Sequence, residues 1–74
     1  MDTQIKFGRH AKRRMQWRRI SEEEVYLVIE NPDKIEESLK GRINVYKSLG
    51  RRYIKVTYKK FSSEILIISV VDKA

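Results

Sequence analysis

Three side chains in the first quarter of the chain have types and spacing suited to chemistry on a phosphate. His10 is the only histidine in 74 residues, and Arg14 and Arg18 follow it at intervals of four. Histidine titrates near neutral pH, so His10 is the natural general acid or base. Helical spacing puts all three on one side, where the two guanidinium groups can hold a phosphate bidentately. We interpret them as catalytic candidates for metal-independent RNA cleavage, in which a 2′-OH attacks the adjacent phosphate.

A second set of candidates lies in the middle of the chain, where tyrosines are interleaved with cations. Tyrosine rings stack on unpaired bases, and Lys and Arg side chains follow the nucleic-acid backbone. Tyr53 and Tyr58 differ in parity along one strand, so they should face opposite sides of a sheet. The expected nucleic-acid-binding residues are Lys47, Arg51, Arg52, Tyr53, Lys55 and Tyr58, with Tyr46 beside them.

Each candidate on the first helix also has a purely structural interpretation. His10 can cap the helix or pack against the sheet edge, and Arg14 and Arg18 can pair with the glutamates at 22–24. Trp17 fits a core position or an interface anchor better than a base-stacking platform. The sequence leaves these alternatives open.

The charge of the chain is arranged in blocks. Residues 1–20 hold seven basic and one acidic side chain, residues 21–39 one basic and seven acidic, and residues 40–60 eight basic and none acidic. Two basic segments separated by an acidic one indicate a positive surface assembled from two elements, which suits a polyanion such as RNA. The alternative is the solvated surface of a highly charged protein.

Two short helices are expected to position these residues. Residues 4–7 form a very short strand or a lead-in, and the first helix begins near Gly8 or Arg9, with Ala11 and Met15 on its apolar stripe.

The second helix carries the clearest local signal in the sequence. Ser21 as N-cap and Glu24 three residues later make a capping box, and Asn31-Pro32 ends the helix.

From residue 33 onward the apolar period changes to two, which predicts strands. The segment 64–71 is nearly all apolar and β-branched, as in a central strand covered on both faces. If it lies at a sheet edge instead, it invites pairing with another chain, so a dimer is compatible with the sequence. The expected strands are residues 34–39, 43–47, 53–58 and 64–71.

These elements predict a single α+β domain over residues 1–74. In the most economical arrangement, the two N-terminal helices pack on one face of a three- to four-stranded antiparallel sheet. The absence of cysteine and the lone histidine predict no metal and no cofactor. No apolar segment is long enough to span a membrane, so we expect a cytoplasmic protein, and a charged fraction of 36% favours a thermophilic source.

The first helix and the turn after it carry a motif that covers residues 10–21: His-Ala-x-x-Arg-Met-x-x-Arg-x-Ile-Ser. With the Asn-Pro that follows and the basic hairpin beyond it, this motif resembles a family of small prokaryotic domains similar to RelE/ParE-like toxins of toxin–antitoxin pairs. The resemblance implies a toxin-type fold whose relatives are metal-independent ribonucleases or gyrase poisons. The position usually held by glycine is Arg19 here, so the turn lacks a free left-handed residue or strains Arg19 by about 1 kcal/mol.

Three functions fit these observations. The first is the toxin component of a toxin–antitoxin pair, an RNA endonuclease acting free or on the ribosome and neutralised by a small acidic antitoxin encoded nearby. The second is a non-catalytic RNA-binding module that uses the same basic surface. The third is an inactive toxin-like domain that retains only a protein partner.

Overall fold

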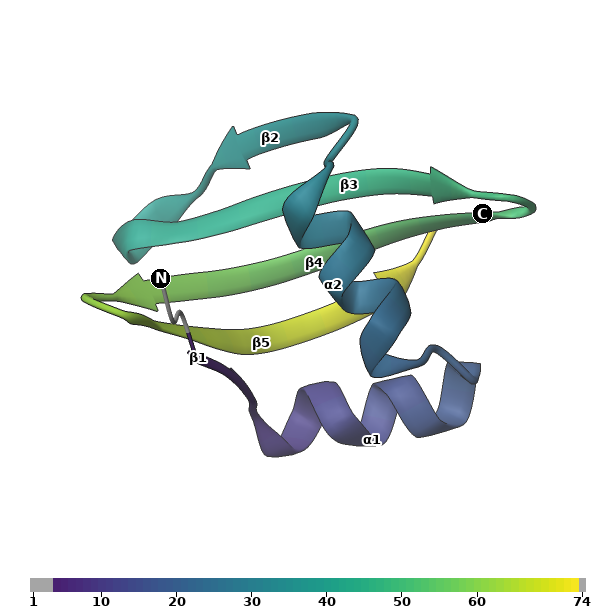
Figure 1. Ribbon diagram of the computed structural model, residues 1–74, viewed down its shortest axis with the longest axis horizontal. Coiled ribbons are helices and arrows are strands. Elements are labelled where there is room, and N and C mark those ends of the chain that lie inside the picture. The colour runs from purple at the N-terminus through teal and green to yellow at the C-terminus, as the bar shows by residue number, and fades with distance from the viewer. Residues whose placement is uncertain (1–3, 74) are drawn as a thin grey trace.

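The computed structural model describes residues 4–73, which form an α+β fold with two helices and a five-stranded mixed sheet (Figure 1). The sheet order is β1-β5-β4-β3-β2. Strand β1 runs parallel to β5, and the other neighbours are antiparallel. The elements are β1 (Gln4–Phe7), α1 (Arg9–Arg18), α2 (Glu22–Glu30), β2 (Lys34–Glu37), a 3₁₀ turn (Leu39–Gly41), β3 (Arg42–Leu49), β4 (Arg52–Phe61) and β5 (Glu64–Asp72).

The α+β class, the two N-terminal helices and the very short strand at residues 4–7 confirm the sequence prediction. The expected three- to four-stranded antiparallel sheet matches only roughly, because β1 joins the four antiparallel strands as a fifth, parallel one. Strand β1 has only four residues and pairs with β5, which lies almost sixty positions away in the sequence. A segment this short shows too few alternations to be identified by its period. No helix within residues 4–73 has the length and hydropathy needed to cross a membrane.

Helix α1 begins and ends without side-chain capping. Gly8 is an extended N-cap whose N–H donates to the carbonyl of Ile67 at 2.9 Å. A Cβ at Gly8 would lie 3.0 Å from that same oxygen, so glycine allows the helix start to approach β5 closely. At the other end Arg19 adopts the left-handed conformation with φ 55°, so the turn is made by the strained residue.

Helix α2 has the capping box that the sequence predicts. The N–H of Ser21 donates to Glu24 Oε1 at 2.8 Å, and the N–H of Glu24 donates to Ser21 Oγ at 3.1 Å. Val25 and Val28 are fully buried against the sheet. In Figure 1, α2 crosses β3 and β4 while α1 lies along β5.

The core forms between the helices and one face of the sheet. Strand β5 supplies Ile65, Ile67 and Val70, which share that face because an irregularity in the pairing of β4 with β5 leaves Ile68 without a partner on β4. The expectation that residues 64–71 are covered on both faces is wrong, since Leu66 and its neighbours on the other face are only partly buried. Nor is β5 an edge strand, because β1 and β4 flank it.

Candidate nucleic-acid interface

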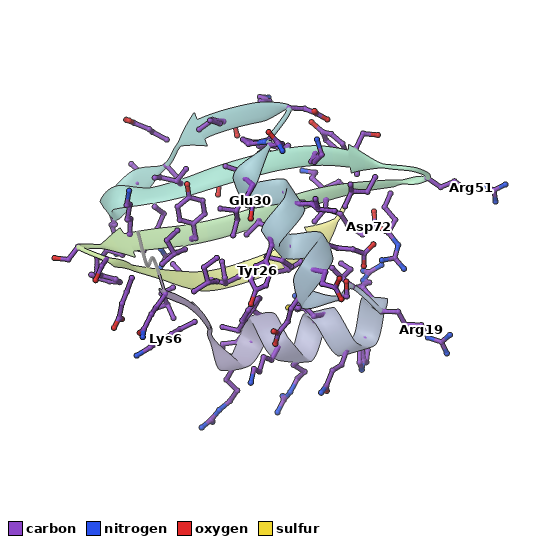
Figure 2. All side chains as sticks on the ribbon, viewed as in Figure 1. Lys6, Arg19, Tyr26, Glu30, Arg51 and Asp72 are labelled. Carbon is purple, nitrogen blue, oxygen red and sulfur yellow. The ribbon has the colours of Figure 1, made fainter. Side chains whose placement is uncertain are left out.

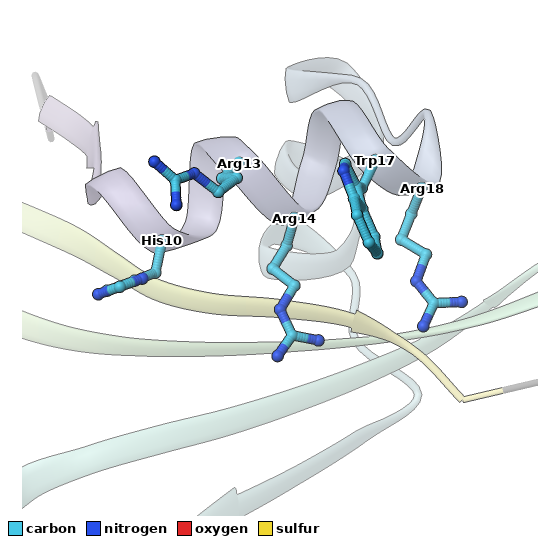
Figure 3. A pocket seen from close by; sticks show the side chains of 5 residues that line it. All are labelled: His10, Arg13, Arg14, Trp17 and Arg18. Carbon is cyan, nitrogen blue, oxygen red and sulfur yellow. The ribbon is translucent and has the colours of Figure 1, made fainter.

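The outer side of helix α1 carries an open hollow of about 540 Å³ (Figure 3). Ala11 and Met15 are buried on one side of the helix, and the polar residues that flank this apolar stripe are left exposed to solvent. The hollow is lined by His10, Arg13, Arg14, Trp17 and Arg18, which we call the α1 surface. All three catalytic candidates therefore lie together on one side of one helix.

The cations of the α1 surface have no partner inside the described part of the chain. Arg14 and Arg18 make no ion pair or hydrogen bond within residues 4–73, so they do not pair with the glutamates of α2. Glu24 is instead occupied by the capping box and by Arg52. His10 is exposed and does not cap the helix, whose N-cap is Gly8. Capping by His10 and pairing of Arg14 and Arg18 with the glutamates at 22–24 are therefore not seen in the described residues.

Trp17 lies in solvent rather than in the core. Its side chain is 84% exposed, the largest exposed fraction among the large apolar residues described. In Figure 3 the indole ring lies between Arg14 and Arg18 and points to the same side of α1 as both. Helical spacing predicts that Trp17 lies close to His10, and the structure shows both at the same hollow. The solvent exposure of Trp17 was not predicted.

Two of the expected sheet cations are held by main-chain carbonyls at the ends of the helices. Lys47 Nζ donates to the carbonyl of Asn31 at 2.8 Å and lies 3.7 Å from Asp33. Arg52 donates to the carbonyl of Arg19 at 2.9 Å. Both side chains thus fasten a helix end to the sheet.

The remaining sheet candidates separate onto different surfaces. Tyr53 lies on the face that the helices leave open, where its ring stacks against Tyr46 with centroids 5.8 Å apart and Lys55 lies 5.9 Å from the Tyr46 ring. Tyr58 packs against the core on the other face, as the difference in parity predicts. Arg51 extends into solvent from the β3–β4 turn (Figure 2).

A short hydrogen bond organises the open face around Tyr46. Its hydroxyl donates to Glu36 Oε1 at 2.6 Å, and Lys34 lies 3.4 Å from the same carboxylate. The bond from Tyr46, followed by the one from Lys34, lowers the pKa of Glu36 below its ordinary value. The same bond raises the pKa of Tyr46. This cluster is internally satisfied, unlike the α1 surface.

The helix and the hairpin meet at one end of the molecule. The bond from Arg52 to the carbonyl of Arg19 joins the turn end of the β3–β4 hairpin to the end of α1. In Figure 2 the side chains of Arg19 and Arg51 both project at this end. The two basic segments, residues 1–20 and 40–60, are therefore adjacent at the end where Arg19 and Arg52 meet. Elsewhere β5 lies between α1 and β4. Among residues 4–73, no three His, Asp or Glu side chains are grouped as metal ligands.

Comparison with known proteins gives one match. Residues 7–72 match the model of a family described as "Domain of unknown function (DUF4258)". No curated protein and no solved structure matches the chain.

Proposed function

For this chain, which belongs to the DUF4258 family, we propose the function of a toxin in a toxin–antitoxin pair that cleaves RNA without a metal ion. The observation that carries the proposal is the α1 surface. This surface brings a histidine, the side-chain type suited to general acid–base chemistry at neutral pH, together with Arg14 and Arg18. Neither guanidinium group is paired with a carboxylate within residues 4–73. Such a surface is suited to a phosphodiester.

The chemistry follows from the residue types. Arg14 and Arg18 lie one helical turn apart and would hold the phosphate and offset the charge that develops on its oxygens. His10, one turn earlier, would take the proton from a ribose 2′-OH as that oxygen attacks phosphorus. The bond to the 5′ oxygen then breaks, and this oxygen takes a proton from water. The products are a 2′,3′-cyclic phosphate and a 5′-OH.

The RelE/ParE-like character of the fold and the antitoxin partner belong to the same proposal. Two helices lie between the short strand β1 and the four antiparallel strands of the sheet, and the motif of residues 10–21 covers most of α1 and the turn after it. A small acidic antitoxin would complement a net charge of +7. RNA, free or on the ribosome, would compete with that antitoxin for the α1 surface.

A second candidate is a non-catalytic RNA-binding module. One observation favours it: the hollow is lined by three arginines, a tryptophan and a single histidine, so its lining supplies no second acid or base. A binder needs none. The two candidates predict the same affinity and differ only in turnover.

The test is incubation of the purified protein with a labelled single-stranded RNA in EDTA at low salt. We expect cleavage by the wild type, and a loss of about 100-fold or more in rate for His10→Ala, in line with the usual worth of general acid–base catalysis. Binding of RNA by His10→Ala should be close to that of wild type. Arg14→Ala should weaken binding and cleavage together.

Lys12→Ala is the matched control. Lys12 is an exposed cation on the same helix and does not line the hollow. This variant should cleave at the wild-type rate. Binding without cleavage by the wild type would favour the non-catalytic module or a toxin that acts only on the ribosome. The absence of both binding and cleavage would refute the RNA function.

A further inference from the structure

Trp17 is exposed to an extent that its chemistry does not favour. An indole presents a large apolar ring, and burial of such rings stabilises cores and interfaces. Here 84% of the residue is in contact with solvent, and no aromatic side chain within residues 4–73 lies in ring contact with it. Tryptophan is enriched where proteins meet a partner, so its exposure beside a candidate site is the observation from which the inference starts.

The neighbours of Trp17 define the chemistry of that ligand. The other residues lining the hollow are three arginines and one histidine, and helix α1 contains no acidic residue. Tryptophan and arginine are also frequent at protein–protein interfaces, but the core of such an interface is depleted in charge as a whole. The indole of Trp17 is instead bordered by guanidinium groups. This combination of one ring with cations on both sides is typical of single-stranded nucleic-acid binding.

We propose that Trp17 stacks on an unpaired nucleobase of the RNA, next to the phosphate that Arg14 and Arg18 hold. This inference rests on the proposed function and deepens it by naming the substrate class as single-stranded RNA. The two arginines are about 6 Å apart along the helix axis, which is the rise of four residues. Trp17 lies between them in Figure 3, so a base stacked on its ring would adjoin the phosphate that the two arginines hold.

Paired RNA cannot use this surface in the same way. In an A-form duplex the bases are stacked on one another, so no face is free to meet the indole. A duplex would contact the arginines alone. Discrimination between single-stranded and double-stranded RNA thus depends on Trp17.

The chain offers a direct readout, because Trp17 is its only tryptophan. The probe is a 5′-labelled 2′-O-methyl oligoribonucleotide, which cannot be cleaved because it lacks the attacking hydroxyl. Binding is followed by anisotropy of the label, and stacking by the emission of Trp17. We expect strong quenching by the single strand, none by a duplex of equal length, and none by inorganic polyphosphate, which has no bases.

Substitution separates stacking from charge. Trp17→Ala should bind the single strand about 5- to 150-fold more weakly, the usual worth of one stacked base. Trp17→Phe should recover most of this loss because it keeps a ring. Affinity for the duplex should be the same in all three proteins.

Each contrary outcome identifies what has failed. Binding of the single strand with unchanged Trp17 emission and unchanged affinity in Trp17→Ala would overturn the stacking inference and leave the proposed function standing. If a poly-glutamate peptide quenched the emission of Trp17 and RNA did not, the stacking inference would be overturned in favour of an acidic protein partner. Absence of both binding and cleavage of unmodified RNA would remove the proposed function as well.

Discussion

At the scale of single residues, the cations of this protein differ in whether the molecule itself holds them. Lys47 and Arg52 each donate to a main-chain carbonyl at a helix end and lie beside a carboxylate. Arg14 and Arg18 have neither kind of partner within residues 4–73. A guanidinium group without an internal partner retains its full charge for an external phosphate. Among the sequence-predicted cations, Arg14, Arg18 and Arg51 are therefore the ones that no hydrogen bond, ion pair or ring contact within residues 4–73 occupies.

Glu36 gives a prediction on pH. The pKa of Glu36 is lowered in the folded protein, first by the hydrogen bond from Tyr46. A carboxyl group with a lowered pKa contributes stability above its unfolded pKa and loses that contribution as the pH falls through its folded pKa. Glu36→Gln should therefore melt at a lower temperature than wild type at neutral pH, and the difference should disappear in acid.

Thermal unfolding across the range from neutral to acidic pH checks this. Glu37→Gln is the control, because Glu37 makes no hydrogen bond or ion pair within residues 4–73. A difference for Glu36→Gln that stays constant with pH would contradict the linkage.

The residues of α1 were predictable as a group, because helical spacing is regular and all of them share one helix. The exposure of Trp17 was not predictable, since Trp17 lies on the flank of the buried Ala11–Met15 stripe, and how far burial extends around α1 depends on where β5 and α2 pack. The partners of Lys47 and Arg52 were also beyond sequence reasoning. Lys47 binds a carbonyl oxygen 16 positions away in the sequence, and Arg52 binds one 33 positions away. Because every residue has a carbonyl oxygen, no residue type marks these two as the partners.

At the scale of elements, the turn between the two helices (the helix joint) is formed by Arg19, whose backbone is in a strained conformation. Arg19 adopts φ 55°, and its carbonyl accepts the hydrogen bond from Arg52. The side chain of Arg19 is exposed and takes no part in that bond. The joint therefore needs the backbone conformation of this residue and not its charge.

Arg19→Gly should stabilise the fold. Glycine adopts the left-handed region without the steric cost of a Cβ, so we expect a gain of about 0.5–1 kcal/mol in the free energy of unfolding. For a domain of this size that corresponds to an increase of roughly 2–8 °C in Tm. Gln16→Gly, inside the same helix, should instead lower stability by about 1 kcal/mol. Equal losses in both variants would show that the joint is not strained.

The elements with strong local signals were predictable, and those set by distant partners were not. The capping box at Ser21 and the Asn31-Pro32 stop define α2 through residues within a few positions of each other. The parallel pairing of β1 with β5 depends on residues at opposite ends of the chain. The irregularity near Ile68 hides the alternation of β5, which made a strand with one open face resemble one covered on both.

At the scale of the whole molecule, positive charge is concentrated on surfaces that the acidic segment does not reach. Three glutamates occupy the first turn of α2, where they suit the positive end of the helix and where Glu24 pairs with Arg52. The outer side of α1 is left uncompensated. This separation predicts binding that is directional and strongly dependent on salt.

The salt dependence can be stated as a slope. Each phosphate contact on a single strand contributes about −0.7 to the dependence of log K on log salt concentration, so three arginines on the α1 surface predict about −2. Arg14→Ala should reduce the magnitude of the slope by about 0.7, and Lys12→Ala should leave it unchanged. Anisotropy titrations at several salt concentrations measure it. An equal change in both variants would show that binding follows net charge rather than the α1 surface.

The pairing of β1 with β5 also bears on when the protein can fold during synthesis. Helix α1 packs on a strand that the ribosome makes last among the described elements, and a ten-residue helix is marginal in water by itself. At usual elongation rates, about 3–12 s separate β1 from the start of β5. During that interval His10, Arg14 and Arg18 belong to an unfolded segment, so the nascent chain has no assembled site. Any activity against RNA would begin only once the sheet is complete.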